Sequence, residues 1–119
     1  MKLIYVASPY AGDIETNMEY AKQACRTVME NGNAFFAPHL LYPSILDDAV
    51  SSERQLGIDM GLTMLSKCDE LWVFGSRISA GMQVEMEEAE RIGIPIHRME
   101  ISKNMRETPG MAMMGQEGV

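Results

Sequence analysis

Short apolar runs alternate with longer stretches of helical periodicity along this 119-residue chain. The apolar runs are rich in β-branched and aromatic residues and predict strands at residues 3–7, 34–37, 70–74 and 94–101. The stretches between them predict helices at residues 16–30, 52–67 and 79–92. Strands that alternate with helices form βαβ units, because parallel neighbours need a crossover connection. The alternation therefore restricts the chain to an α/β fold with a parallel sheet covered on both faces.

Local signals predict where these elements begin and end. Capping-box spacing places the start of the first helix at Thr16 and the start of the second at Ser52. Asn31, which is followed by glycine, ends the first helix, and Pro38 stops the second strand. The segment from residue 39 to residue 50 has no regular period, so it is expected to be irregular.

The composition excludes several classes of function. The net charge is −7, and lysine and arginine are scattered, which argues against a nucleic-acid polymer as partner. No apolar run approaches the length of a membrane span, and the N-terminus lacks a signal-peptide layout. We therefore expect a cytoplasmic protein that does not bind membranes.

The two cysteines, Cys25 and Cys68, show no metal-binding or redox spacing. They are expected to be small core residues in a reducing compartment. No metal ion and no other cofactor is predicted. Residues 1–101 are expected to form one domain, and residues 102–119, which lack a period, are expected to form a flexible tail or a subunit-contact arm.

Glu85 lies on the apolar side of its predicted helix. At about 100° per residue, one arc of this helix carries Met82, Glu85, Met86, Ala89 and Gly93. The other glutamates of the helix mostly lie outside this arc. A buried carboxylate is costly, so Glu85 needs a partner, a raised pKa or a catalytic role. The alternative is that Glu85 sits at the edge of the apolar stripe and reaches water.

The loops that follow the strands are the expected place for a ligand, because open parallel sheets bind ligands beyond the carboxyl ends of their strands. These loops contain Ser8, Pro9 and Tyr10 after the first strand, Pro38 and His39 after the second, and residues 75–81 after the third. Ser79 is an expected N-cap and Gly81 permits close backbone approach, so an anion could bind at this helix start. Alternatively, Ser79 is only a cap. Neither GxGxxG nor a P-loop is present.

Two parts of the chain resemble the nucleoside 2-deoxyribosyltransferase superfamily. They are Tyr5 with the loop after it, and the pattern Ser79-x-Gly81-x-Gln83-x-Glu85-x-x-x-Ala89. The resemblance covers about residues 3–97 and is greatest to small phage and bacterial relatives. It implies a flavodoxin-like doubly wound parallel sheet of about four to five strands. It also implies a homo-oligomer whose subunits share active sites.

The resemblance also implies roles for individual residues. Glu85 would attack the anomeric carbon and form a glycosyl-enzyme intermediate, and Tyr5 would orient it. Ser79, with Gly81 and Met82 in the same motif, implies a 5′-phosphate on the substrate, as in relatives that hydrolyse nucleoside 5′-monophosphates. Tyr5 could equally make only a structural bond.

The acid that protonates the leaving base has no clear counterpart. The resemblance places this acid about eight residues before the position of Asp69. In this chain that position is Gly61, where no acid is available. The nearest carboxylate, Asp59, is two residues earlier and would point about 200° away unless the helix shifts locally. In the loops, Tyr10 could stack on the base, and Ser8, Pro9 and His39 could contact the substrate. Tyr10 could equally be a surface aromatic, and His39 a structural histidine.

The sequence therefore predicts an N-glycosidase that hydrolyses the base–sugar bond of a nucleoside 5′-monophosphate. Two alternatives stay open: a non-catalytic protein that binds or sequesters a nucleotide, and a deoxyribosyltransferase that exchanges bases.

Overall fold

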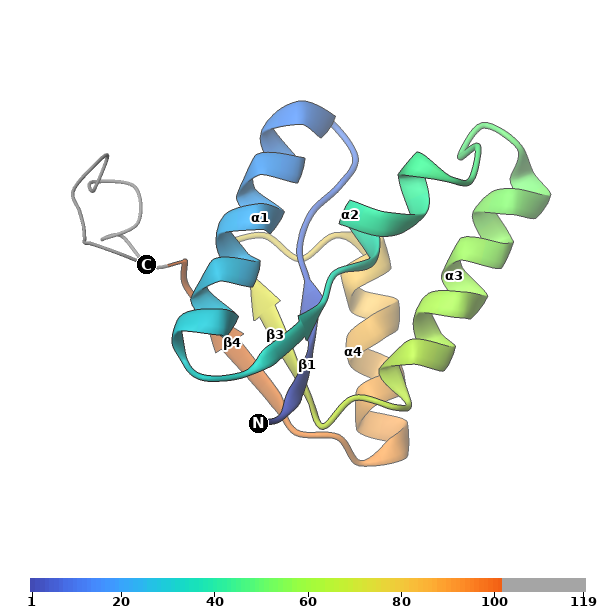
Figure 1. The fold of residues 1–119 in the computed structure, drawn as a ribbon. Helices are drawn as coiled ribbons and strands as arrows, with labels where there is room; N and C mark the ends of the chain where they lie inside the picture. Colours follow the sequence, from blue (N-terminus) through green and yellow to red (C-terminus); the bar gives the residue numbers. More distant parts are fainter. Residues whose placement is uncertain (102–119) are drawn as a thin grey trace.

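A single parallel sheet forms the centre of the computed structural model, which describes residues 1–101 (Figure 1). The predicted tail, residues 102–119, lies outside the described residues. The strands run in the spatial order β2-β1-β3-β4. Their bounds are β1 (Leu3–Ala7), β2 (Ala34–Phe36), β3 (Glu70–Phe74) and β4 (Ile96–Met99).

The strand order reverses between β1 and β3. Strand β1 pairs with β2 through Ile4 opposite Phe35, and with β3 through Val6 opposite Trp72. The chain first moves outward from β1 to β2 and then returns to the other side of β1. This is the beginning of the flavodoxin-like order, so the predicted doubly wound α/β fold is confirmed.

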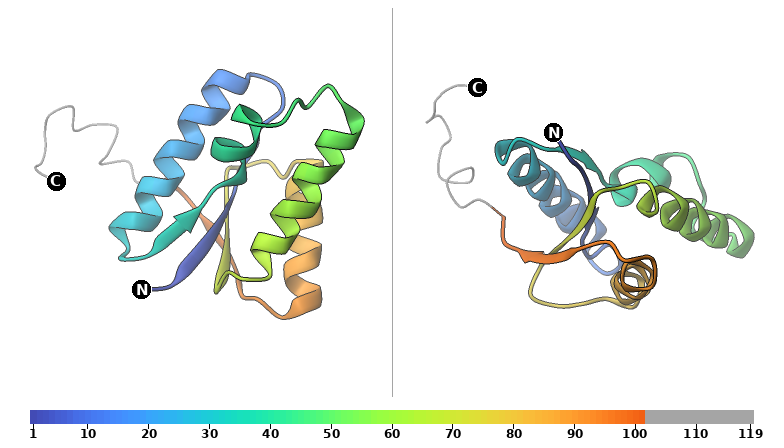
Figure 2. Two further views of the ribbon diagram at one scale, coloured as in Figure 1. Left: turned by 45° about the vertical axis from the view of Figure 1, so that its right-hand side comes forward. Right: turned by 90° about the horizontal axis from the view of Figure 1, so that it is seen from below.

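The helices cover both faces of the sheet (Figure 2). Helix α1 (Ile14–Glu30) packs on one face, and helices α3 (Ser51–Leu65) and α4 (Ala80–Ile92) pack on the other. Alternation along β1 divides the core, because successive side chains of a strand point to opposite faces. Ile4 and Val6 pack in the cluster under α1, whereas Tyr5 and Ala7 pack in the cluster under α3 and α4.

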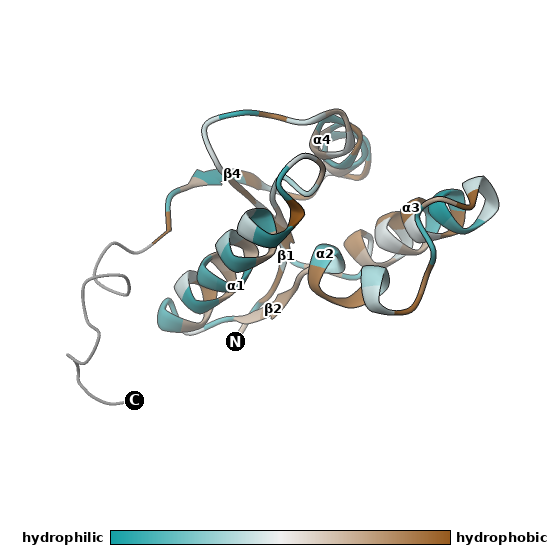
Figure 3. Cartoon of the chain, turned by 90° about the horizontal axis from the view of Figure 1, so that it is seen from above, coloured by the Kyte–Doolittle hydropathy of each residue, from teal (hydrophilic) through white to brown (hydrophobic). Residues whose placement is uncertain are grey.

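Helix α3 is less buried than α1. Five residues of α1 are buried, but the only buried residues of α3 are Gly61 and Leu65, near its C-terminal end. The N-terminal half of α3 extends beyond the sheet, and Leu56 and Ile58 are 48% and 44% exposed (Figure 3). This overhang leaves room between α3 and α4.

Several element boundaries differ from the prediction. Helix α1 begins at Ile14, two residues before the predicted start, because Asp13 is its N-cap and accepts bonds from the amide and the hydroxyl of Thr16. The N-cap of α3 is Val50, which provides no side-chain cap. The prediction of an irregular segment from residue 39 to residue 50 was partly wrong. Helix α2 (Pro38–Leu41) and a 3-10 turn (Tyr42–Ser44) begin it, because Pro38 suits the first helical position.

The two cysteines lie on opposite faces of the sheet. Cys25 belongs to the cluster under α1, and Cys68 to the cluster under α3 and α4. Burial raises the pKa of each thiol to about 11. Within residues 1–101, none of the helices combines the length and the apolarity needed to cross a membrane.

Candidate functional site

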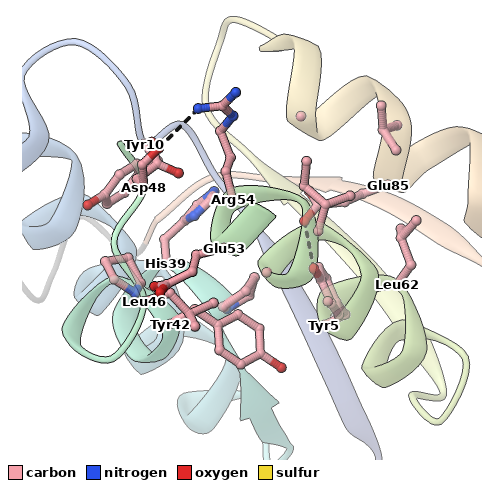
Figure 4. Close-up of a pocket in the computed structure, with 17 residues that line it drawn as sticks. Tyr5, Tyr10, His39, Tyr42, Leu46, Asp48, Glu53, Arg54, Leu62 and Glu85 are labelled. Carbon is pink, nitrogen blue, oxygen red and sulfur yellow. Dashed lines mark hydrogen bonds between the residues drawn. The ribbon is translucent and has the colours of Figure 1, made fainter. Parts of the chain in front are cut away.

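A cavity of about 180 Å³ opens between α3, the N-terminal part of α4 and the segment that follows β2 (Figure 4). Its floor includes Tyr5 from β1. Residues from all of these elements line it: Tyr5, Tyr10, Pro38, His39, Tyr42, Pro43, Leu46, Asp48, Glu53, Arg54, Gly57, Ile58, Gly61, Leu62, Gly81, Val84 and Glu85. Most of the lining is apolar or aromatic, which is typical of small-molecule sites.

Glu85 and Tyr5 form the polar centre of this cavity. The Tyr5 hydroxyl donates a hydrogen bond of 2.6 Å to Oε2 of Glu85 (Figure 4). Glu85 is only 9% exposed, and its Oε1 has no hydrogen-bond partner among the described residues. Burial raises the pKa of Glu85 to about 7, although the bond from Tyr5 acts in the opposite direction. The pKa of Tyr5 is raised by burial and by the neighbouring carboxylate.

The sequence explains why these two side chains meet. Tyr5 points to the α3–α4 face because it occupies an odd position of β1. Glu85 shares the buried stripe of α4 with Met82 and Ala89. Gly61 of α3 leaves space for the contact, since a Cβ at this position would lie 3.1 Å from the Tyr5 hydroxyl oxygen. Glu85 is therefore buried in the stripe and does not sit at a solvent-exposed edge.

Asp59 does not reach the cavity. It is exposed, and its Oδ1 accepts a hydrogen bond of 3.0 Å from Nε2 of Gln55 on the same helix. Gly57 and Gly61 flank Asp59 at a spacing of two residues, and both line the cavity. Two residues correspond to about 200° around a helix, so Asp59 lies on the far side of α3. No local shift of the helix corrects this offset.

Tyr10 and His39 form one wall of the cavity. Their rings stack with centroids 4.9 Å apart and planes inclined by 26°. Burial lowers the pKa of His39, although an interaction with the backbone of Ser8 acts in the opposite direction. The imidazole is therefore neutral near pH 7. Since the two ring faces that meet are covered, a flat ligand can pack on an outer ring face or against the ring edges.

Of the other predicted binding residues, only Gly81 lines the cavity; Ser8, Pro9, Ser79 and Met82 do not. Ser8 is 1% exposed, and Met82, also 1% exposed, belongs to the core under α4. Pro9 packs near Gly75, where a Cβ would lie 3.5 Å from its ring. The Ser79 hydroxyl accepts a hydrogen bond of 3.2 Å from the amide of Met82, as an N-cap does. Gly81 is the residue of the Ser79–Met82 turn that lines the cavity.

Four polar or aromatic residues of the lining were not predicted from the sequence: Tyr42, Asp48, Glu53 and Arg54. They come from the segment expected to be irregular and from the first turn of α3. The Nη1 of Arg54 donates a hydrogen bond of 3.0 Å to the backbone carbonyl of Asp48 (Figure 4). Charged residues crowd next to the predicted start of α3, but this pattern does not distinguish them from ordinary surface charges.

The described residues contain no group of three histidine, cysteine, aspartate or glutamate side chains that could hold a metal ion. A buried carboxylate that is held by a tyrosine and opens into an apolar cavity can act as a nucleophile or can exchange a proton near neutral pH.

Fold and site together define an α/β protein with a cavity next to the switch point of its sheet. A family model described as a domain of unknown function, DUF7768, matches residues 2–99, so the chain belongs to this family. No curated protein is similar enough to this chain to count as a match.

Two solved structures share the fold. One is a 2-deoxyribosyltransferase from Bacillus psychrosaccharolyticus, with a TM-score of 0.68 and 17% identity, over 87% of this chain and 78% of that one. The other is a 2-deoxyribosyltransferase from Leishmania mexicana, with a TM-score of 0.55 and 15% identity, over 97% of this chain and 76% of that one. At these identities the similarity establishes the fold alone.

Proposed function

We propose that the chain cleaves the N-glycosidic bond of a nucleoside 5′-monophosphate, with Glu85 as the nucleophile. The observation that carries the proposal is the state of this carboxylate. One of its oxygens is held by Tyr5, and the other is buried at the cavity without a partner among the described residues. A carboxylate in this state suits attack on an oxocarbenium-like carbon, since little solvent must be displaced first.

The proposed reaction has two steps. Oε1 of Glu85 attacks the anomeric carbon while the carbon–nitrogen bond breaks and its electron pair leaves with the base. A proton from water neutralises the base, because Asp59 faces away from the cavity. Water then attacks the glycosyl ester, which releases the sugar and restores the carboxylate. Tyr5 keeps its hydrogen bond to Oε2 and holds the reacting oxygen in place.

In this proposal the 5′-phosphate binds at the N-terminal end of α4. Gly81 faces the cavity there, and the first amides of a helix attract anions. The Ser79 hydroxyl oxygen caps the helix, and its hydrogen is free to donate to a phosphate oxygen. If this assignment is right, Ser79→Asp weakens the reaction of monophosphates far more than that of nucleosides. An equal loss for both substrates would remove Ser79 from the site.

The exposed apolar residues around the cavity support a homo-oligomer that covers it. Ile45 is 70% exposed, and Val50 and Val84 are 42% and 43% exposed. A second copy packed against this region would bury these side chains. Sedimentation equilibrium of the wild type and of Ile45→Asp tests this arrangement, because the charged variant would be monomeric.

The central experiment measures base release from the four ribonucleoside and four deoxyribonucleoside 5′-monophosphates by chromatography. We expect Glu85→Gln to lose at least about 10³-fold in rate while staying folded. Glu90→Gln, on the exposed side of the same helix, is the matched control and keeps the wild-type rate. A folded Glu85→Gln protein with wild-type activity would refute the mechanism.

Two other functions have specific support. Asp59, the predicted acid, lies outside the cavity, so protonation of the leaving base has less support, which favours a protein that binds a nucleotide without cleaving it. Tight stoichiometric binding without free base identifies this case. The fold neighbours are transferases, which favours base exchange. A product that forms only after an acceptor base is added identifies that reaction.

A further inference from the structure

Among residues 1–101, Arg54 is the only lysine or arginine that lines the cavity. It stands in the first turn of α3 and is exposed at the mouth. Three carboxylates, those of Asp48, Glu53 and Glu85, line the same cavity, in a chain of net charge −7. A cation in this setting has a large effect on which charged ligands can enter.

Arg54 lies at the same end of the cavity as the start of α4. Both α3 and α4 run opposite to the parallel strands, so both begin at the carboxyl edge of the sheet (Figure 1). Arg54 precedes Gly61, which adjoins the Tyr5 hydroxyl, by seven residues, or about 10 Å along the helix. Gly81 precedes Glu85 by about one turn of α4. Arg54 and Gly81 are thus both displaced from Glu85 toward the mouth.

The guanidinium of Arg54 is held in place without being neutralised. Nη1 donates to the backbone carbonyl of Asp48 at 3.0 Å, which leaves its other donors available. No ion pair joins Arg54 to a carboxylate among residues 1–101. Oε1 of Glu53 instead accepts a 2.6 Å hydrogen bond from the amide of Asp47.

We propose that Arg54 binds the 5′-phosphate of the substrate and selects nucleotides over nucleosides, an inference that rests on the proposed function. A phosphate close to Glu85 would be repelled by its carboxylate, so the phosphate needs a place away from it. The mouth provides that place, with the amides of α4 on one side and a guanidinium on the other. Arginine suits this role because its planar fork matches two phosphate oxygens.

The test compares kcat/KM for each monophosphate with kcat/KM for the corresponding nucleoside. Arg54→Gln lowers this ratio about 10-fold to 100-fold, as expected for the loss of a charge-assisted contact, and leaves the nucleoside values within about twofold. Arg54→Lys keeps the charge without the fork and gives an intermediate ratio. Arg26→Gln, on the exposed side of α1, is the control and leaves the ratio unchanged.

Binding separates this inference from the proposed function. If the wild type releases no base from any substrate, the same ligand pairs are titrated calorimetrically, and the ratio of their Kd values replaces the kinetic ratio. A ratio that falls in Arg54→Gln supports Arg54 even though the glycosidase proposal has failed. An unchanged ratio, or an equal loss for nucleosides and monophosphates, overturns the inference.

Discussion

The two faces of the sheet use the same strands for different purposes. Under α1, the alternate residues of β1 and β3 pack into a fully apolar cluster that includes Ile4, Val6 and Phe74. Under α3 and α4, Tyr5 comes from the same strand β1, but its hydroxyl meets a buried carboxylate. Each face carries a cluster of buried apolar residues, but only the α3–α4 face also holds a buried carboxylate next to a cavity. The difference shows that one strand can supply packing alone on one side and packing together with the candidate chemistry on the other.

The largest expected effect is on the α1 face. Phe74 is completely buried there, so Phe74→Ala costs about 3–5 kcal/mol of unfolding free energy. Ile58→Ala, on the exposed overhang of α3, costs less than about 1 kcal/mol. Urea unfolding of the two variants measures both values. Equal losses would mean that the overhang of α3 is packed as tightly as the core under α1, which would contradict the comparison.

The buried carboxylate makes the α3–α4 face sensitive to pH. Glu85 titrates at an ordinary pKa of 4.5 in the unfolded chain and at about 7 in the folded one. Between these values the folded state keeps a proton that the unfolded state has lost, so stability falls as pH rises. The difference between the two pKa values corresponds to about 3 kcal/mol of unfolding free energy, which is lost between pH 4.5 and pH 7.

Glu85→Gln removes this dependence. Between pH 4.5 and pH 7, we expect the free energy of unfolding of the variant to rise by about 3 kcal/mol relative to that of the wild type. Urea unfolding at several pH values measures this difference. Glu90→Gln, whose side chain is exposed, follows the wild type. If the unfolding free energies of the wild type and of Glu85→Gln changed with pH in parallel, burial would not raise the pKa of Glu85, and this prediction would be wrong.

Loss of the Tyr5 hydroxyl is expected to have a smaller effect. Tyr5→Phe leaves both oxygens of Glu85 without a partner among the described residues, at a cost of about 1–3 kcal/mol. Since the hydrogen bond from Tyr5 lowers the pKa of Glu85, the variant has a pKa above 7. Carboxyl carbon NMR during a pH titration measures this change. Tyr42→Phe, also at the cavity, serves as the control and leaves the titration unchanged.

The smallest expected effect is a difference in stability between alanine substitutions at two glycines of α3, Gly57 and Gly61. An alanine in a helix is usually more stable than a glycine by about 0.5–1 kcal/mol. At Gly57 the new methyl meets only the end of the Leu46 side chain at 3.3 Å, so the gain is kept. At Gly61 it meets the bonded Tyr5 hydroxyl at 3.1 Å, so the gain is lost. Thermal unfolding of Gly57→Ala and Gly61→Ala measures the two changes in stability. Equal increases would show that the Tyr5 side chain can move to make room for a methyl group at position 61.

The fold was largely predictable because periodicity reports which side of an element is buried. The alternation of elements predicted the parallel sheet, whereas the stripe on α4 placed Glu85 beside the buried residues and left open whether it reaches water. Helix starts were less accurate, since Asp13 caps α1 while the spacing favoured Thr16. Several residues can satisfy the first amides of a helix, and tertiary contacts decide among them.

The cavity wall was harder to predict. Arg54 and Asp48 show no periodic signal, because exposed charges near a helix start occur in most proteins. Their position depends on how far α3 extends past the sheet, which is set by packing at Gly61 and Leu65. The offset of Asp59 was predictable from helix geometry alone, and the structure shows the same offset.

The cysteines provide one internal reporter for each layer of the molecule. Burial and a pKa of about 11 make both thiols slow to react with alkylating reagents near neutral pH, since the thiolate is the reactive form. Alkylation of Cys25 therefore requires the α1 layer to open, and alkylation of Cys68 requires the opposite layer to open. Peptide mapping of the label over time would thus read local opening on each side of the sheet within a single unmodified chain.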